Sequence, residues 1–323
     1  MILLNLLVMM MNIYFLNLMR LMKTNRFFAL AMMAATVLAC QKENAVETNN
    51  AEVFTAVIEQ SEPDSKAFLT DELKVRFAKN DKIRVCEETF TTKKDCKCIT
   101  DGTSVAEFQF NTALPANAAS YYAVYPYNAT RPTGTSYGQV QNLSKGDATF
   151  NGDQKYEFKA ESNIFPTQVA VVGGVDPNSF GMAGKAGSDK VLRFSQMSSL
   201  VKFELKKAGV AKVVLASLNT GTYIAGRYNV QCLDTDNDGW FDAFTQGTSN
   251  NDQSSTITLL PPGEGSEFPQ GVYYIATRPG RNCSGGLSLT FYDAAGNELK
   301  SFSNTSKVQL NRGKVRNLGS FTW

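Results

Sequence analysis

The sequence predicts an all-β protein made of two domains in tandem, each a β-sandwich or a barrel. Short runs of β-branched and aromatic residues recur between turn residues, and several alternate apolar with polar side chains, the period of a half-buried strand. Amphipathic helical patterns do not extend beyond about two turns. A glycine-rich stretch, 173–190, divides the chain after Cys40 into halves of ordinary domain size. Strands at this spacing favour sandwiches or barrels over βαβ units.

Residues 1–39 are predicted to be a signal peptide. Two basic residues follow Met22, an apolar stretch comes next, and the segment ends in Leu-Ala before Cys40. This ending is typical of a bacterial lipobox, whose cysteine is acylated after the peptide is cut before it, and several acyl chains anchor a protein firmly. The alternative is an ordinary buried cysteine. Residues 1–21 could cross a bilayer, but Met22 alone begins a complete signal, so we take it as the true start.

Composition excludes several classes of protein. The chain has no histidine, which excludes Ser-His-Asp hydrolases, Cys-His proteases and His-ligated zinc or haem. Of its 32 Lys and Arg residues three precede Cys40, and none of its 30 acids does, so 29 cations face 30 acids in the exported part. Such a balance lacks the basic surplus of nucleic-acid-binding domains, and no nucleic-acid partner is expected.

The exported part is predicted to consist of three segments. Residues 40–52 are polar and form a lipidated, disordered tether. The N-terminal sandwich spans 53–188 and the C-terminal sandwich 189–323, and a long loop inside the second half is the alternative reading of 173–190. The expected strands lie at 53–58, 83–85, 106–110, 121–125, 169–172, 201–205, 213–215, 256–260, 272–276, 287–291 and 299–302.

Five cysteines follow Cys40. An exported chain meets an oxidising compartment, so disulfides are allowed, and an odd number leaves at least one thiol unpaired within the chain. We expect one bond in the first half, from Cys86 to Cys96 or Cys98, and one in the second, from Cys232 to Cys283. The spacing does not decide between the first two.

The sharpest local motif runs from Asp234 to Asp242. Its D-x-D-x-D-G core matches the first half of a calcium loop, in which carboxylates at alternate positions converge on one ion and glycine permits the turn. The predicted ligands of a structural Ca²⁺ ion are Asp234, Asp236, Asp238 and Asp242. An EF-hand is excluded, because Thr245 stands where an acid is required and neither flank is helical. The alternative is an aspartate-rich turn that binds nothing.

Catalysis has little support. The sequence contains no G-x-S-x-G elbow, no phosphate-binding G-x-x-x-x-G-K-[ST] loop and no H-E-x-x-H motif, so no catalytic residue and no catalytic cofactor are predicted. The aromatic run from Tyr121 to Tyr127 could present rings to a sugar, but such a run is more often a strand with alternate rings in the core.

Several blocks in a shared order resemble the fimbrillin family, the lipoprotein pilins and pilin-like proteins of Bacteroidales. The resemblance covers nearly the whole chain after the signal peptide. The blocks are the lipobox at Cys40, FTAVIE at 54–59 with DSK at 64–66, NDKI at 80–83, YYAVYPY at 121–127, LRF at 192–194 with VKFE at 201–204, IAG at 224–226, GVYYIA at 271–276 and LNRGKVRNLG at 310–319.

The resemblance implies two Greek-key, transthyretin-like sandwiches and a place in a fimbria. Family pilins reach the outer membrane as lipoproteins and are cut by a trypsin-like protease after the first strand, and a strand from the next subunit fills the groove. The matching strand here is 53–60, with the cut between Lys66 and Ala67. The family site is typically arginine, and the nearest one, Arg76, lies in a strand-like pattern that should protect it.

The sequence therefore predicts a non-enzymatic, surface-exposed outer-membrane lipoprotein that joins an extracellular fimbria and contributes to adhesion. Its expected partners are other pilin subunits, the membrane through lipid, and a ligand on a host or bacterial surface. Because the ending at 318–323 is expected to leave little beyond the last core strand to donate to a neighbour, a tip or accessory subunit is favoured over a stalk subunit. The alternative function is a monomeric glycan-binding lipoprotein, and an exported hydrolase is a third.

Overall fold

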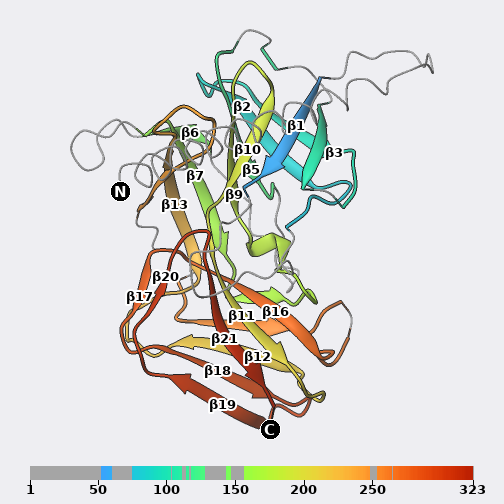
Figure 1. Cartoon of the computed structure of the whole chain (residues 1–323), viewed down its shortest axis with the longest axis vertical. Coiled ribbons are helices and arrows are strands. Elements are labelled where there is room, and N and C mark those ends of the chain that lie inside the picture. Colours follow the sequence, from blue (N-terminus) through green and yellow to red (C-terminus); the bar gives the residue numbers. More distant parts are fainter. Residues whose placement is uncertain are drawn as a thin grey trace, which may run out of the picture. The chain divides into compact units, whose positions relative to one another are not determined.

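The computed structural model describes residues 52–59, 75–102, 104–110, 114–115, 118–127, 143–146, 156–247, 253–263 and 265–322. The predicted all-β class is confirmed: the described residues form strands and one short 3-10 helix, η1 (Pro177–Ser179), but no α-helix (Figure 1). The strands are β1 (Val53–Ile58), β2 (Lys82–Glu87), β3 (Lys93–Cys98), β4 (Val105–Phe110), β5 (Tyr121–Tyr125), β6 (Ser144–Lys145), β7 (Phe158–Ile164), β8 (Thr167–Val169), β9 (Met182–Ala186), β10 (Val191–Gln196), β11 (Ser199–Leu205), β12 (Lys212–Ser217), β13 (Gly226–Leu233), β14 (Ala243–Gly247), β15 (Thr256–Leu260), β16 (Gly271–Thr277), β17 (Arg281–Cys283), β18 (Leu287–Tyr292), β19 (Glu298–Asn304), β20 (Val308–Leu310) and β21 (Val315–Phe321).

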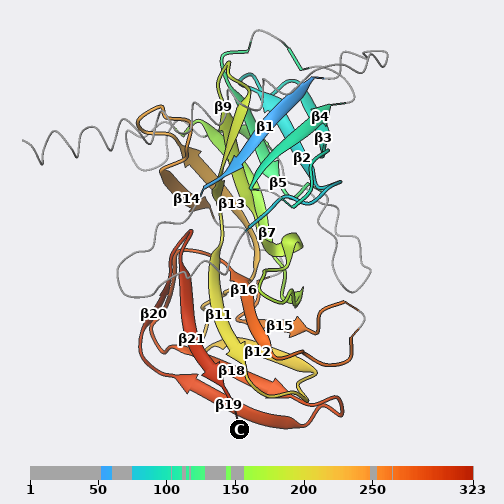
Figure 2. The ribbon, with the colours of Figure 1, turned by 45° about the vertical axis from the view of Figure 1, so that its right-hand side comes forward.

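The first strands close into a barrel in the order β1-β10-β9-β5-β2-β3-β4, with β1 paired to both β10 and β4 (Figures 1 and 2). Closure leaves this sheet without free edges. Alternation fills its interior, as β4 shows: Ala106, Phe108 and Phe110 are buried while the residues between them are more exposed. The barrel therefore has its own apolar core.

The remaining strands form four smaller sheets. Three of these are β16-β11-β21, β19-β18-β12-β15-β8 and the short pair β17-β20, and the fourth is β14-β13-β7-β6. In β11, Val201, Phe203 and Leu205 are buried and the charged residues between them are half-buried, which is the alternation that predicted this strand. Strand β18 repeats the pattern with Leu287, Leu289 and Phe291.

Several pairings join strands from before and after residue 188, the expected domain boundary. In the barrel, β10 pairs with β9 and β1. Strand β7 pairs with β13 over seven residues, and β8 pairs with β15. The division into domains at 188 stays a prediction, and any such division must account for these shared sheets.

The glycine-rich stretch 173–190 contains a strand that the sequence did not suggest. Strand β9 is buried at all five positions and lies between β5 and β10. A Cβ on Gly184 would lie 3.1 Å from the ring of Phe194, so a side chain there would crowd the barrel. Close packing against Phe194 therefore favours glycine at this position, which lies in a strand and not in a flexible linker.

Candidate functional site

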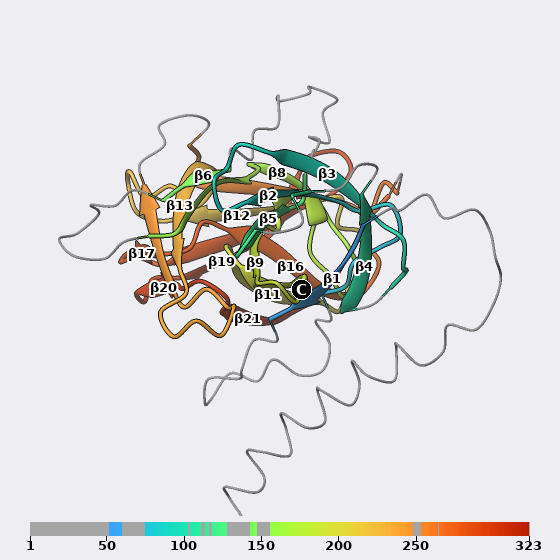
Figure 3. The ribbon, with the colours of Figure 1, turned by 90° about the horizontal axis from the view of Figure 1, so that it is seen from above.

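Strand β1 is the first candidate, because the sequence predicts it to be removable. It runs antiparallel to β4, with Ala56 opposite Ala106, and parallel to β10, with Ala56 opposite Leu192 (Figures 1 and 3). A strand with neighbours on both sides satisfies its N–H and C=O groups along its whole length. Its loss would open the barrel and leave two unpaired edges, on β4 and on β10.

The inward face of β1 is apolar and alternates with the outward face. Phe54 and Ala56 are fully buried and Ile58 nearly so. The ring of Phe54 lies 5.0 Å from the ring of Phe110 and 5.0 Å from that of Tyr121, in tilted and edge-on arrangements that aromatic pairs prefer. Burial of a large apolar side chain stabilises a fold by about 1.5–3 kcal/mol, so β1 contributes a substantial part of the barrel's stability.

Polar contacts hold both ends of β1. Before the strand, Glu52 forms an ion pair with Lys190 and accepts a hydrogen bond from the backbone N–H of Leu114 at 2.8 Å. After it, the N–H of Glu59 donates to the carbonyl of Phe194 at 2.8 Å, and the carboxylate of Glu59 meets Arg312 at 3.2 Å. These contacts fix the pairing register of β1 and the inward direction of its apolar side chains at both ends of the strand.

The predicted processing and lipidation residues lie outside the described residues. These are Lys66 and Ala67 at the cut and Cys40 at the lipobox. The strand itself ends at Ile58, as the residue pattern predicts and two residues before the end that the resemblance implies. Arg76, expected to be protected inside a strand, is instead exposed and belongs to no strand, although its Nη1 donates to the carbonyl of Gly102 at 3.0 Å.

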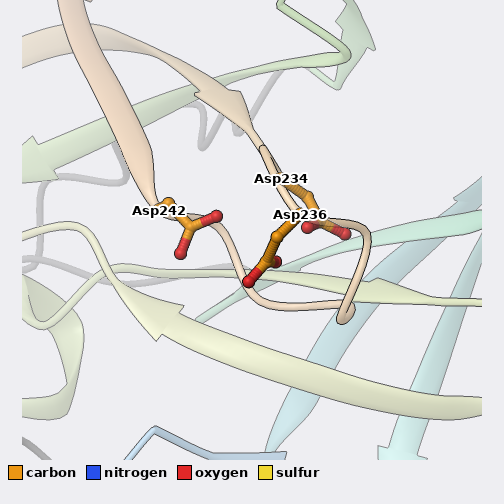
Figure 4. A group of neighbouring side chains, drawn as sticks. All are labelled: Asp234, Asp236 and Asp242. Atoms are coloured by element: carbon orange, nitrogen blue, oxygen red, sulfur yellow. The ribbon is translucent and has the colours of Figure 1, made fainter.

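The aspartate loop between β13 and β14 is the second candidate. Oxygens of Asp234, Asp236 and Asp242 lie within 4.8 Å of one another, and Figure 4 shows the three side chains around the turn. Asn237 and Gly239 adopt positive φ angles of 60° and 91°, which fold the chain back sharply. The left-handed conformation is ordinary for glycine and tolerated by asparagine. The turn chemistry in the sequence therefore brings these carboxylates together.

Asp238, the fourth predicted ligand, does not belong to this group. Its Oδ1 accepts a hydrogen bond from the N–H of Trp240 at 2.8 Å. Burial and the neighbouring carboxylates of Asp236, Asp234 and Asp242 raise its pKa above the ordinary value. The structure thus differs from the predicted set of four by placing Asp238 in a turn-stabilising role.

Asp234 is the buried member of the cluster. Its Oδ2 lies 2.8 Å from the ammonium of Lys185 and accepts a hydrogen bond from the N–H of Gly239 at 3.0 Å. The same ammonium also contacts Glu157 at 2.8 Å. The Oδ1 atom of Asp234 is buried and has no hydrogen bond of normal geometry. Burial raises the pKa of Asp234, but Lys185 and the nearby backbone N–H groups outweigh burial and hold this pKa below its usual value. Asp234 is therefore a buried carboxylate that Lys185 and the loop backbone hold in its charged form.

The network around Lys185 was not anticipated from the sequence. Lys185 lies in β9 and bridges the aspartate loop to Glu157, which also accepts a hydrogen bond from the hydroxyl of Tyr122 at 3.1 Å. Burial lowers the pKa of Lys185, but its two carboxylate partners raise it further and leave it above the ordinary value. Because 49 positions separate Lys185 from Asp234, no local pattern connects them.

The five cysteines that follow Cys40 are free, buried thiols, so the predicted disulfides are absent. Pairing register explains the first half: Cys86 stands opposite Lys93, and Cys96 stands opposite Ile83. Burial raises the pKa of Cys86 to about 12, which suppresses its thiolate.

The aromatic run contributes mainly to the core. Tyr121, Tyr122 and Tyr125 are buried, so they offer no platform to a sugar. Tyr127 is half-buried, and the guanidinium of Arg84 covers its ring at 3.8 Å and also contacts its hydroxyl. The prediction that the run packs into the core is therefore confirmed for Tyr121, Tyr122 and Tyr125, and the alternative, in which Tyr121 or Tyr127 stacks on a glycan, is not supported by their packing.

No family model and no curated protein matches this sequence. Among solved structures, one named a "putative cell adhesion protein" from Bacteroides uniformis is similar at 12% identity and a TM-score of 0.41, covering 85% of this chain and 94% of its own. A fimbrial assembly protein from Parabacteroides distasonis is similar at 10% identity and a TM-score of 0.30, with 83% and 90% covered. A fimbrial protein from Bacteroides ovatus is similar at 12% identity and 0.28, with 76% and 44% covered.

Within the described residues, no helix has the length and apolar character needed to cross a bilayer.

Proposed function

We propose that the protein is a non-enzymatic, fimbrillin-like pilus subunit that assembles by strand exchange and contributes to adhesion. The placement of β1 carries this proposal: the first strand after the tether closes the barrel between β4 and β10. Cleavage after Lys66 would separate it covalently from everything that follows. Its departure would bare the rings of Phe110 and Tyr121, and a strand from another subunit would cover them and pair with both edges.

Lipid on Cys40 would first hold the subunit at the outer membrane and so expose it at the surface. Replacement by Cys40→Ser should release the full chain from membranes, because several acyl chains are needed for firm anchoring. Fractionation of cells expressing each form tests this. Continued membrane association of the variant would overturn lipidation at Cys40 and point to residues 1–21.

The pairing and packing of β21 support a tip or accessory position. This strand is already paired with β11, and its Phe321 packs 4.6 Å from the ring of Phe302. Donation of β21 to a neighbour would therefore require its removal from its own sheet. A subunit that accepts a strand while β21 stays paired in its own sheet would suit a tip or accessory position.

Limited trypsin digestion of the chain that starts at Cys40 tests strand exchange. We expect one early cut after Lys66, followed by oligomers in size-exclusion chromatography and fibres in electron micrographs. Lys66→Gln should stay monomeric. Arg76→Gln is the matched control, because it removes an exposed basic residue that is 10 positions downstream and should leave cleavage and assembly unchanged. Monomers after complete cleavage at Lys66 would contradict the proposal.

We also propose that the aspartate loop binds a structural Ca²⁺ ion, because an oxygen of the buried Asp234 carboxylate lies within 4.8 Å of oxygens of two further carboxylates. Oxygens of Asp234, Asp236 and Asp242 would supply the ligands, completed by backbone carbonyls and water. Calcium should raise the melting temperature and EDTA should reverse the rise. Asp236→Asn should abolish the response, whereas Asp238→Ala should keep it. An unchanged melting temperature in the unmodified chain would overturn this site.

A further inference from the structure

The outer face of strands β2 and β3 is strongly basic. The two strands are neighbours in the barrel (Figure 2), and residues such as Ile83 and Cys96 are buried in its interior. Alternation turns the residues between them outward. The charged side chains of this outer face, which we call the basic face, are those of Lys82, Arg84, Lys93, Asp95 and Lys97. Four cations against one acid give this patch a formal charge of +3, although the whole exported part of the chain is nearly neutral.

Two of these lysines face each other. Lys82 stands directly opposite Lys97 in the antiparallel pairing of β2 with β3. Opposed side chains lie about 5 Å apart at Cβ, and like charges in this position destabilise a sheet. Both lysines are exposed, and neither has an ion-pair partner among the described residues. Lysines often protect the free edges of sheets, but both strands lie inside a closed barrel, so edge protection does not explain this pair.

The single acid of the basic face does not neutralise these lysines. Asp95 is already paired with Arg84, whose Nε and Nη2 lie 2.6 and 3.1 Å from its two carboxylate oxygens. The same guanidinium is held over the ring of Tyr127, 3.8 Å from the ring centre. Lys93, near the opposite end of β3 from Lys97, is also exposed and has no ion pair within the part of the chain that the structure describes. Three lysine charges therefore remain available to a ligand.

Polar residues extend the basic face on both sides of the facing lysines. Gln109 of β4 is exposed and stands opposite Lys97, and the N–H of Tyr127 donates to the carbonyl of Lys82 at 2.9 Å. At the spacing of neighbouring strands, the row from Tyr127 to Gln109 is about 14 Å long. Along β3, Lys93 and Lys97 are about 13 Å apart. The surface is therefore wide enough for several units of an extended polymer.

We propose that the basic face binds a linear anionic polysaccharide, whose carboxylate or sulfate groups pair with Lys82, Lys93 and Lys97. Protein interfaces are depleted in lysine, and β2 and β3, both fully described, expose no apolar side chain that could form the core of one. Anionic membranes are usually held by four to eight basic residues, more than the three free ones here. A polysaccharide presents charges at intervals along one chain, with hydroxyl groups between them that can bind Gln109. The inference rests on the proposed role in adhesion, for which it names the class of ligand.

Binding of defined polysaccharides to the uncleaved chain from Cys40 tests this inference. Isothermal titration calorimetry at low ionic strength should show binding of chondroitin sulfate and polygalacturonate but not of neutral dextran, and added salt should weaken it. A variant with Lys82→Gln, Lys93→Gln and Lys97→Gln should bind roughly 100-fold more weakly, because each lysine near an anionic surface contributes about fivefold.

A matched control variant carries Lys206→Gln, Lys300→Gln and Lys307→Gln. It removes the same charge from three exposed lysines outside the barrel strands, so it should keep the affinity of the unmodified chain. Equal affinities of the basic-face variant and the unmodified chain would overturn the inference, and so would equal losses in the two variants.

The facing lysines also allow a variant that separates binding from folding. Lys97→Glu places an acid opposite Lys82, so it should raise the melting temperature by about 1–3 °C. The same change should weaken polysaccharide binding about 20-fold, because it replaces an attraction by a repulsion. Retained binding in this stabilised variant would overturn the inference.

Two further outcomes separate this inference from its alternatives. Capture of phosphatidylglycerol–phosphatidylcholine vesicles, without binding of either acidic polysaccharide, would overturn it and assign the basic face to a membrane. Because the uncleaved monomer is used, a failure of strand exchange would leave these measurements unaffected. Fimbriae that assemble after cleavage but bind no acidic polysaccharide would overturn this inference alone.

Discussion

The first and last strands of the described chain have similar pairings but different surroundings. Strand β1 runs parallel to β10, and β21 runs parallel to β11, which follows β10 in the chain. However, β1 has a second neighbour, β4, whereas β21 is an edge strand of the sheet β16-β11-β21. One terminal strand is therefore enclosed and the other has one open side.

Their side chains differ in the same sense. In β1 every second residue is buried, from Phe54 to Ile58. In β21 only Phe321 is buried, and the exposed positions include Arg316 and Asn317. Because β1 is enclosed, its removal would leave two unpaired strand edges and an uncovered apolar surface between them. The contrast explains why a first strand suits exchange between subunits, since a better-defined gap selects a replacement strand more strictly.

Deletion of β1 and deletion of β21, each in its own variant, should give the largest difference in stability between the two strands. A chain that begins at Ala67 lacks β1, and we expect it to be unfolded or oligomeric, because it loses the burial of Phe54 and Ile58, at about 1.5–3 kcal/mol each, and the backbone pairing on both sides of the strand, a large part of the stability of a domain. A chain that ends at Lys314 lacks β21 and should remain a folded monomer with a lower melting temperature. Circular dichroism and light scattering distinguish these outcomes.

A synthetic peptide of residues 52–60 provides the control for the first deletion. It should restore a monomeric, folded state to the chain that begins at Ala67, and a peptide carrying Phe54→Asp should not. A folded monomer without any peptide would contradict the enclosed role of β1.

Single substitutions should show the same order with smaller effects. Phe54→Ala is expected to lower the free energy of unfolding by about 3–5 kcal/mol, because the ring is fully buried against Phe110 and Tyr121. Phe321→Ala should cost about 2 kcal/mol, since the edge position can relax more easily. Urea titration of both variants measures the two values. Equal losses would remove the distinction between the strands.

Sequence patterns were sufficient for the strands that alternate and insufficient for β9. Residues 201–205 and 287–291 alternate apolar with polar side chains and form parts of β11 and β18. Strand β9 consists of three small residues, one methionine and one lysine, and it packs closely where Gly184 meets the ring of Phe194. Such a contact joins two strands and leaves no periodic signal in either of them.

The aspartate loop shows the same limit at a site. Its spacing predicted that carboxylates meet, because residues within one turn are close whatever the rest of the fold does. It did not predict Lys185, whose contact with Asp234 depends on how β9 is placed. The facing lysines of the basic face are also invisible in the sequence, since Lys82 and Lys97 meet only through the register of β2 with β3.

Acid should destabilise the barrel that β1 closes, because it protonates the carboxylate of Glu87. This β2 carboxylate accepts hydrogen bonds from Thr91 Oγ1 at 2.6 Å and from the N–H of Thr92 at 2.9 Å. Burial raises its pKa, but these donors and the Thr89 hydroxyl outweigh burial and lower the pKa from 4.5 to about 2. A lowered folded-state pKa stabilises the fold above the unfolded value, and this stability is lost as pH falls from about 4.5 to 2.

Glu87→Gln should therefore flatten the acid dependence of the melting temperature over that range, with a loss of roughly 1 kcal/mol at pH 6. Thr91→Val is the matched variant, since it removes one donor and keeps the shape of the side chain. It should give an intermediate slope. An acid dependence of Glu87→Gln identical to that of the unmodified chain would exclude this source.

The smallest expected effect concerns the contact that joins the two terminal strands. Arg312 precedes β21 by three positions, and its Nη1 contacts Glu59 at 3.2 Å and the carbonyl of Gln196 at 3.1 Å, while its guanidinium lies 3.9 Å from the ring centre of Phe244. A double-mutant cycle with Glu59→Gln and Arg312→Gln isolates the ion pair from these other contacts. Because both side chains are partly exposed, a coupling of about 0.5–1 kcal/mol is expected.

After a cut at Lys66 the same pair would help to retain β1. Glu59→Gln should therefore also speed the release of the cleaved strand, measured by mass spectrometry of the free peptide. Zero coupling with unchanged release would show that the enclosed strand is held by its apolar face and backbone pairing alone.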